Sequence, residues 1–105
     1  MNDLEFDGFE WDPQKSDLTL KHRGFDFIAA ASIFDGWFTE REDTRRDYGE
    51  PRFISTGEVD GAYLTVVWTP RGRNRRIISA WPASDQERRT YREQRAIHER
   101  RNPQA

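Results

Sequence analysis

The sequence predicts one α+β domain: an antiparallel sheet of four to five strands, two N-terminal helices and one C-terminal helix. Two observations lead to this class. Helix-start signals occur near residues 12, 26 and 84, and a two-residue hydrophobic period occupies much of residues 37–80. The 105-residue chain, 13% of it aromatic, suits one modest core. We expect the domain to occupy residues 1–99 and residues 100–105 to form a flexible C-terminal tail.

The N-terminal part predicts the order β-α-α. Residues Leu4–Trp11 alternate in character and predict a first strand. Asp12 is suited to capping a helix that has Pro13 at its first position and ends before Gly24. A second, short helix is predicted over Phe27–Phe34.

The remaining chain predicts β-β-β-β-α. A charged loop is expected over Asp43–Pro51, and Ser84 with Glu87 forms a capping box that begins a last helix running to about Glu99. Asp60-Gly61 is typical of a hairpin turn, and Pro70-Arg71-Gly72 predicts the next turn. The four strands are expected over Trp37–Glu42, Arg52–Val59, Ala62–Thr69 and Arg75–Ala80.

Composition excludes several classes of protein. The chain has no cysteine and only two histidines, so a disulfide scaffold, a thiolate metal site and a cysteine nucleophile are ruled out. We expect no metal site and no cofactor. The sequence contains no apolar run of membrane-spanning length, and its first residues do not resemble a signal peptide. We therefore expect a cytoplasmic protein that makes no membrane contact.

Charge is distributed unevenly along the chain. Residues 1–70 carry seven basic and fifteen acidic side chains, whereas residues 71–105 carry ten arginines and four acids. A basic final third suits a polyanion such as RNA or an acidic partner protein. Because arginine grips phosphate bidentately, the absence of lysine from this part favours phosphate binding. Arginines that simply decorate a solvated helix are the alternative.

Three charged segments are candidates for a site. The first is the basic run Lys21-His22-Arg23, in which histidine could transfer protons near neutral pH; compensation of a helix dipole is the alternative. The second is the loop over residues 42–52, with a salt-bridged surface loop as its alternative. The third is the arginine-rich turn over residues 69–76, where the alternative is a solvated turn. The candidates in the second and third segments are Asp43, Glu50, Arg52, Arg71, Arg73, Arg75 and Arg76.

Ordered short motifs in this sequence resemble the BrnT toxins. The resemblance covers roughly residues 6–95. It is carried by Phe9-Glu10-Trp11-Asp12-Pro13, Arg23-Gly24-Phe25-Asp26-Phe27, Ile33-Phe34-Asp35-Gly36, Asp47-Tyr48-Gly49-Glu50, Val66-Val67-Trp68-Thr69-Pro70-Arg71-Gly72 and Arg76-Ile77-Ile78-Ser79-Ala80.

This resemblance implies a RelE-like fold and the toxin half of a type II toxin–antitoxin pair. Such toxins are metal-independent RNA endonucleases that inhibit translation. The implied partner is a BrnA-like ribbon-helix-helix antitoxin. The complex would be a heterotetramer that contacts operator DNA mainly through the antitoxin. The candidate catalytic residues are then Lys21, His22, Arg23, Asp43, Glu50, Arg52, Arg71 and Arg76, and the candidate RNA-binding residues are Arg71, Arg73, Arg75 and Trp81.

Two positions depart from the pattern of the similar toxins. Many of them have Lys-His-Gly after the first helix, whereas here Arg23 intervenes before the glycine. They also usually carry arginine where this chain has Trp81. Simple alternation places Trp81 on the same strand face as Ile77 and Ser79, opposite Arg76. If that face lines the active-site cleft, Trp81 stands where an arginine would bind phosphate, and tryptophan cannot replace its charge. The alternative function is then an attenuated toxin that binds its antitoxin and acts as a co-repressor.

Overall fold

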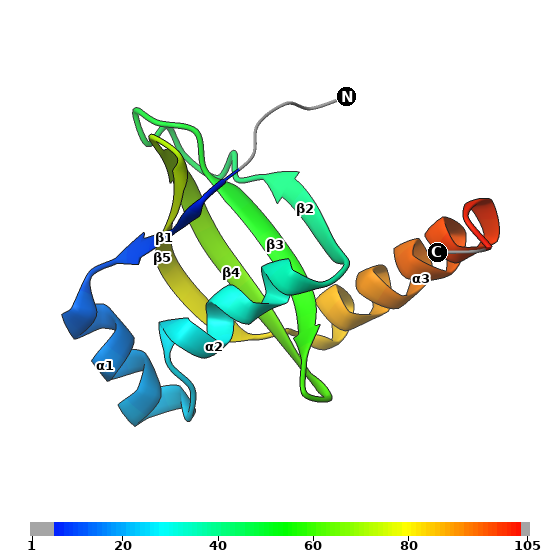
Figure 1. The fold of residues 1–105 in the computed structure, drawn as a ribbon, viewed down its shortest axis with the longest axis horizontal. Helices are drawn as coiled ribbons and strands as arrows, with labels where there is room; N and C mark the ends of the chain where they lie inside the picture. Colours follow the sequence, from blue (N-terminus) through cyan, green and yellow to red (C-terminus); the bar gives the residue numbers. More distant parts are fainter. Residues whose placement is uncertain (1–5, 104–105) are drawn as a thin grey trace.

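The computed structural model describes residues 6–103 and shows one curved sheet with helices against it (Figure 1). Helix α2 crosses the near face of the sheet in Figure 1, α1 lies beside the β1–β5 edge, and α3 extends away from the rest of the domain. The elements in chain order are β1 (Gly8–Trp11), α1 (Pro13–Arg23), α2 (Phe27–Ala31), the 3-10 turn η1 (Ser32–Asp35), β2 (Phe38–Glu42), β3 (Phe53–Val59), β4 (Ala62–Arg71), β5 (Asn74–Pro82) and α3 (Asp85–Arg101).

The predicted α+β class and element order are confirmed, but the sheet is mixed. Its strand order is β1-β5-β4-β3-β2. The four later strands pair antiparallel, as expected, whereas β1 pairs parallel with β5 from Gly8 opposite Asn74 to Trp11 opposite Ile77. The expectation of an antiparallel sheet is therefore wrong for β1. Parallel neighbours need a long connection, and here three strands and two helices separate the pair.

Several element boundaries differ from the sequence predictions. The first strand begins at Gly8, and Leu4 lies outside the described residues. The predicted helix over residues 27–34 divides into α2 and η1, and α3 continues past Glu99 to Arg101. Of the predicted tail, residues 104 and 105 lie outside the described part of the chain.

The turn between β4 and β5 falls later than predicted. Strand β4 continues through Pro70 to Arg71, and the turn is formed by Gly72 and Arg73. Pro70 is tolerated because pairing with β3 ends at Trp68, so β4 has a partner on one side only at that point. Gly72 has a φ of 60°, a left-handed conformation that glycine adopts without strain.

The core lies between α2 with η1 and one face of the sheet, which we call the core face. Phe27 and Ile33 are fully buried there. Gly57 of β3 permits this packing, because a Cβ atom on it would lie 2.8 Å from Cβ of Ile33. The buried cluster consists of Phe27, Ala30, Ala31, Ile33, Leu64, Val66, Trp68, Ile77 and Ala80.

A β-bulge in β5 decides which side chains face the core. Trp68 pairs with Ile77 and Val67 with Ser79, which leaves Ile78 as the extra residue. Ile77 and Ala80 both belong to the core cluster in consequence, and Trp81 falls on the opposite face. The predicted placement of Trp81 with Ile77 is wrong, because simple alternation does not account for the bulge.

Candidate active site

A groove runs between α1 and β5, and its middle section is a cavity of about 340 Å³ that we call the central pocket. Lys15, Leu18, Thr19 and His22 recur at the spacing that places side chains on one face of a helix, so α1 presents them together. Strand β5 supplies the opposite wall. The lining residues are Lys15, Leu18, Thr19, His22, Arg23, Phe27, Ile78 and Ser79.

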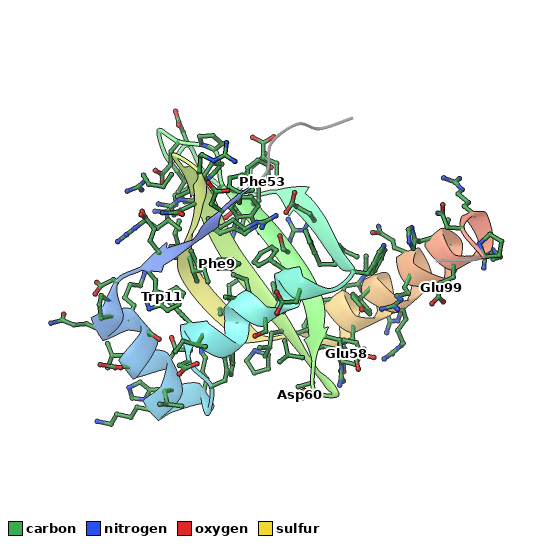
Figure 2. The ribbon with its side chains drawn as sticks, in the orientation of Figure 1. Phe9, Trp11, Phe53, Glu58, Asp60 and Glu99 are labelled. Carbon is green, nitrogen blue, oxygen red and sulfur yellow. The ribbon has the colours of Figure 1, made fainter. Side chains whose placement is uncertain are left out.

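The groove continues into a second, charged cavity of about 210 Å³. Lys15 and Ile78 line both cavities, so the two are neighbours along the groove. In Figure 2, nitrogen-bearing side chains gather at this end of the sheet, close to the labelled Phe53. The charged cavity, which we call the arginine cluster, is lined by Asp12, Lys15, Glu50, Arg52, Arg71, Arg76, Ile77 and Ile78.

Glu50 holds two arginines of this cluster in place. Arg52 donates from Nε to Glu50 Oε2 at 3.2 Å, and Arg71 donates from Nη2 to Glu50 Oε1 at 3.4 Å. The Arg52 guanidinium also lies 4.1 Å from the centre of the Tyr48 ring, a cation–π contact. Arg76 donates to Glu10 at 3.5 Å. Four basic side chains against two lining carboxylates leave the cavity positive, which suits binding of a phosphate group.

The predicted basic run at the end of α1 divides between the groove and solvent. His22 and Arg23 line the central pocket, whereas Lys21 is exposed and lines neither cavity. Arg23 also donates to the carbonyl oxygen of Ala80, which fastens the end of α1 to β5. His22 is therefore the group in this run placed to exchange protons with a ligand in the groove.

Asp43 lies beside the site rather than in it. Its side chain is fully buried, and it accepts two hydrogen bonds from the Arg45 guanidinium, both at 2.8 Å, and one from the Tyr48 hydroxyl at 3.1 Å. The hydrogen bonds from Arg45 hold the pKa of the Asp43 carboxyl well below its usual range, although burial alone would raise it. Asp43 thus fixes the loop that carries Tyr48 under Arg52.

We expect Asp43→Asn to lower the free energy of unfolding at pH 7 by about 1–3 kcal/mol, because an amide loses the charge-assisted hydrogen bonds. A depressed carboxyl pKa stabilises the fold above the pKa of the unfolded chain, near 4, and this contribution is lost as pH falls further. The difference between the two proteins should therefore shrink below about pH 4. Urea unfolding at pH 7 and pH 3 measures it, with exposed Asp47→Asn as control; equal stability at pH 7 would contradict the role of Asp43.

Arg73 and Arg75, two of the predicted RNA-binding residues, lie outside the groove. Arg73 pairs with Asp7 at the surface. The Arg75 guanidinium lies on the core face within a set of aromatic rings, 4.2 Å from the centre of Phe34 and 4.8 Å from that of Trp68. Burial lowers the pKa of Arg75, and its Nε has no hydrogen-bond partner among the described residues. The side chain is thus engaged in packing.

Trp81 also lies away from both cavities. Its indole N–H donates to Glu87 Oε1 at 3.2 Å, the oxygen that also accepts from the backbone N–H of Ser84 in the capping box. Trp81 therefore joins β5 to the first turn of α3. It lies roughly 15 Å along the strand from Arg76.

Sequence reasoning missed several residues of the groove, Lys15 and Ser79 among them. Lys15 joins the two cavities, and Ser79 contributes a hydroxyl group to the central pocket. A signal for Lys15 was present, since it precedes His22 by seven residues and two helical turns place both on one face. Ser79 lies within the motif over residues 76–80 that resembles the BrnT toxins, but the bulge at Ile78 determines which way it points, and that could not be predicted from local alternation. Among residues 6–103 no cluster of three or more His, Asp or Glu side chains is arranged to hold a metal ion.

Comparison with known families decides the relationship of the chain. A family model described as the ribonuclease toxin, BrnT, of type II toxin–antitoxin systems matches residues 11–87. The chain belongs to the BrnT family. A search of the curated proteins finds no match.

As a BrnT chain, the protein is a ribonuclease toxin of a type II toxin–antitoxin system and has an antitoxin as its partner. The matched segment begins at the end of β1 and stops in the first turn of α3, so it contains every residue that lines the groove. In the part of the chain that the structure describes, none of the helices could span a membrane.

Proposed function

We propose that this BrnT chain is a cytoplasmic, RelE-like endoribonuclease that cleaves RNA in the α1–β5 groove with its own side chains and no metal ion. The observation that carries the proposal is that the arginine cluster adjoins the pocket that His22 lines, with Lys15 and Ile78 shared between them. The groove thus combines phosphate ligands with a group able to transfer protons. We also propose a BrnA-like ribbon-helix-helix antitoxin as the partner, through which the complex contacts operator DNA.

The chemistry suited to these side chains is an intramolecular transesterification at the phosphorus atom. The ribose 2′-oxygen attacks the adjacent phosphate and gives up its proton to a base, and the bond to the 5′-oxygen breaks as an acid protonates it. The products are a 2′,3′-cyclic phosphate and a free 5′-hydroxyl. Arg71, Arg76 and Arg52 would stabilise the extra negative charge of the phosphorane. DNA lacks the attacking hydroxyl, so it should not be cleaved.

Incubation of the purified chain with single-stranded RNA, with and without EDTA, tests the proposal. We expect cleavage at equal rates in both samples, with 2′,3′-cyclic phosphate ends and no cleavage of a DNA strand of the same sequence. Cleavage that EDTA abolishes and Mg²⁺ restores would overturn metal independence. Hydrolysis of the DNA strand would overturn the role of the 2′-hydroxyl.

We expect His22→Ala to reduce RNA cleavage far more than His98→Ala, by at least about tenfold. His22 lines the groove. His98 lies in α3 and packs on Trp37, with 5.6 Å between the ring centres. Initial cleavage rates of the two variants and the unchanged protein measure the difference, and melting temperatures report any unfolding. Comparable losses in two folded variants would contradict the assignment of His22.

The presence of tryptophan at position 81 favours a second candidate function, an attenuated toxin that binds its antitoxin and shapes repression. The indole bonds to Glu87 where the resemblance to BrnT toxins expects an arginine. This candidate requires an arginine side chain at this position to reach the groove as a phosphate ligand, although Trp81 itself lines neither cavity.

Under that second candidate, Trp81→Arg should raise single-turnover cleavage and growth arrest by at least about tenfold, because one charged transition-state ligand contributes roughly 10²–10³ in rate. Rates are compared together with melting temperatures. Equal cleavage by two equally stable proteins would reject attenuation. Destabilisation of the variant would instead identify Trp81 as the anchor of α3.

A further inference from the structure

We propose that the central pocket is a nucleobase subsite, which holds the base of a nucleotide whose phosphate lies in the arginine cluster. The proposal rests on the proposed function, and it adds a part of the substrate that the groove recognises besides its backbone. The residues that would hold the base are Leu18 and Ile78, above the buried Phe27, with Thr19 and Ser79 at the polar edge.

The pocket has the lining expected of a base-binding site. Leu18, Phe27 and Ile78 form apolar walls, and the volume of about 340 Å³ is in the range of small-molecule sites. The bulge places Ile78 where it contributes to both cavities, at the junction between base and phosphate. Leu18 lines the pocket and keeps 54% of its surface exposed, so apolar surface is open to a ligand there.

The position of the pocket links it to the phosphate site. Lys15 lies where the two cavities meet, and His22 lies about 10 Å further along α1, at the far end of the pocket. A base on Leu18 and Ile78 would thus place its ribose between the arginine cluster and His22. Arg23 beside His22 and the arginine cluster at the other end are positive groups that complement the phosphates on either side of one nucleotide.

Polar groups at the pocket edge could read hydrogen-bonding positions of a base. The Thr19 hydroxyl donates to the carbonyl oxygen of Lys15 at 2.8 Å, so it presents an acceptor to a ligand. The Ser79 hydroxyl can donate or accept. The apolar walls would contact any base. Hydrogen bonds from these two hydroxyls would allow the pocket to bind some bases more tightly than others.

Two leucines of α1 provide a matched test. Leu18 and Leu20 are 54% and 50% exposed, but only Leu18 lines the groove. We would measure binding of 2′-deoxy pentanucleotides, which lack the attacking hydroxyl, and of an abasic pentamer with the same phosphate charge. The proteins are the unchanged chain, Leu18→Gln and Leu20→Gln. All three should melt at similar temperatures, since neither leucine is in the core.

We expect the unchanged chain and Leu20→Gln to bind base-bearing strands at least about tenfold more tightly than the abasic strand, because a base buries apolar surface against Leu18 and Ile78. Leu18→Gln should lose most of this preference while binding the abasic strand normally. Equal affinity of the unchanged chain for both strands, or equal losses in the two variants, would overturn the subsite. Failure of RNA cleavage with the base preference intact would reject only the proposed chemistry, since binding of these strands does not depend on cleavage.

Discussion

Replacing Arg71 and Arg76 together by alanine is expected to lower RNA cleavage by at least about 10²–10³-fold. Both line the arginine cluster, from neighbouring strands, and loss of a single transition-state donor already has an effect of that size. The substitutions should not unfold the chain. Arg71 is exposed, and Arg76 makes a partly exposed ion pair of the kind that contributes about 1 kcal/mol or less to stability. Single-turnover cleavage of a labelled RNA measures the effect.

RNA binding should weaken in the same double variant, and its dependence on salt should flatten by about one counterion for each phosphate that an arginine no longer neutralises. Arg73→Ala is the matched control, because Arg73 lies in the same turn region but pairs with Asp7 outside the groove. It should retain cleavage within about threefold. Equal losses in the control and the double variant, or an unchanged salt slope in the double variant, would place the RNA elsewhere on the surface.

Phe27→Ala is expected to destabilise the fold by about 3–5 kcal/mol, through the loss of buried apolar surface and the cavity left behind. Phe27 is fully buried at the start of α2, and its ring packs edge to face on Trp11, 6.2 Å between ring centres. For a domain of this size, such a loss lowers the melting temperature by roughly 15–30 °C. Thermal unfolding followed by circular dichroism measures it.

The adjacent residue supplies the control for this prediction. Ile28 belongs to the same helix but is 66% exposed, so Ile28→Ala should change stability by no more than about 0.5 kcal/mol. Similar melting temperatures for the two variants would contradict the core assignment.

Local sequence signals were sufficient to predict most elements of this protein. Asp12 and Pro13 begin α1 as expected, and the Asp12 side chain accepts a hydrogen bond from the backbone N–H of Gln14. Gly24 ends that helix in the left-handed conformation, and Ser84 with Glu87 forms the predicted capping box. These features depend on residues within one or two turns of each other, so the sequence carries them directly. The short motifs that resemble BrnT toxins likewise identified the family that the comparison then showed.

The residues of the candidate site were predictable in part, because some of them cluster closely in the sequence. His22, Arg23, Glu50, Arg52, Arg71 and Arg76 were candidates on residue type and local clustering, and the structure brings them to one groove. Their convergence depends on α1 lying along β5, which no local signal encodes. Lys15 was missed because its importance comes from joining two cavities, although its place on the face of His22 follows from helix geometry.

Only the tertiary structure decided which neighbouring side chains share a face. Parallel pairing of β1 with β5 joins segments more than sixty residues apart, so it depends on the packing of the whole sheet. One extra residue at Ile78 reverses the alternation beyond it, and Trp81 consequently points toward Glu87 rather than lying with Ile77. Arg75 and Arg76 are adjacent in sequence, yet one packs among aromatic rings and the other enters the groove, because successive strand residues point to opposite faces.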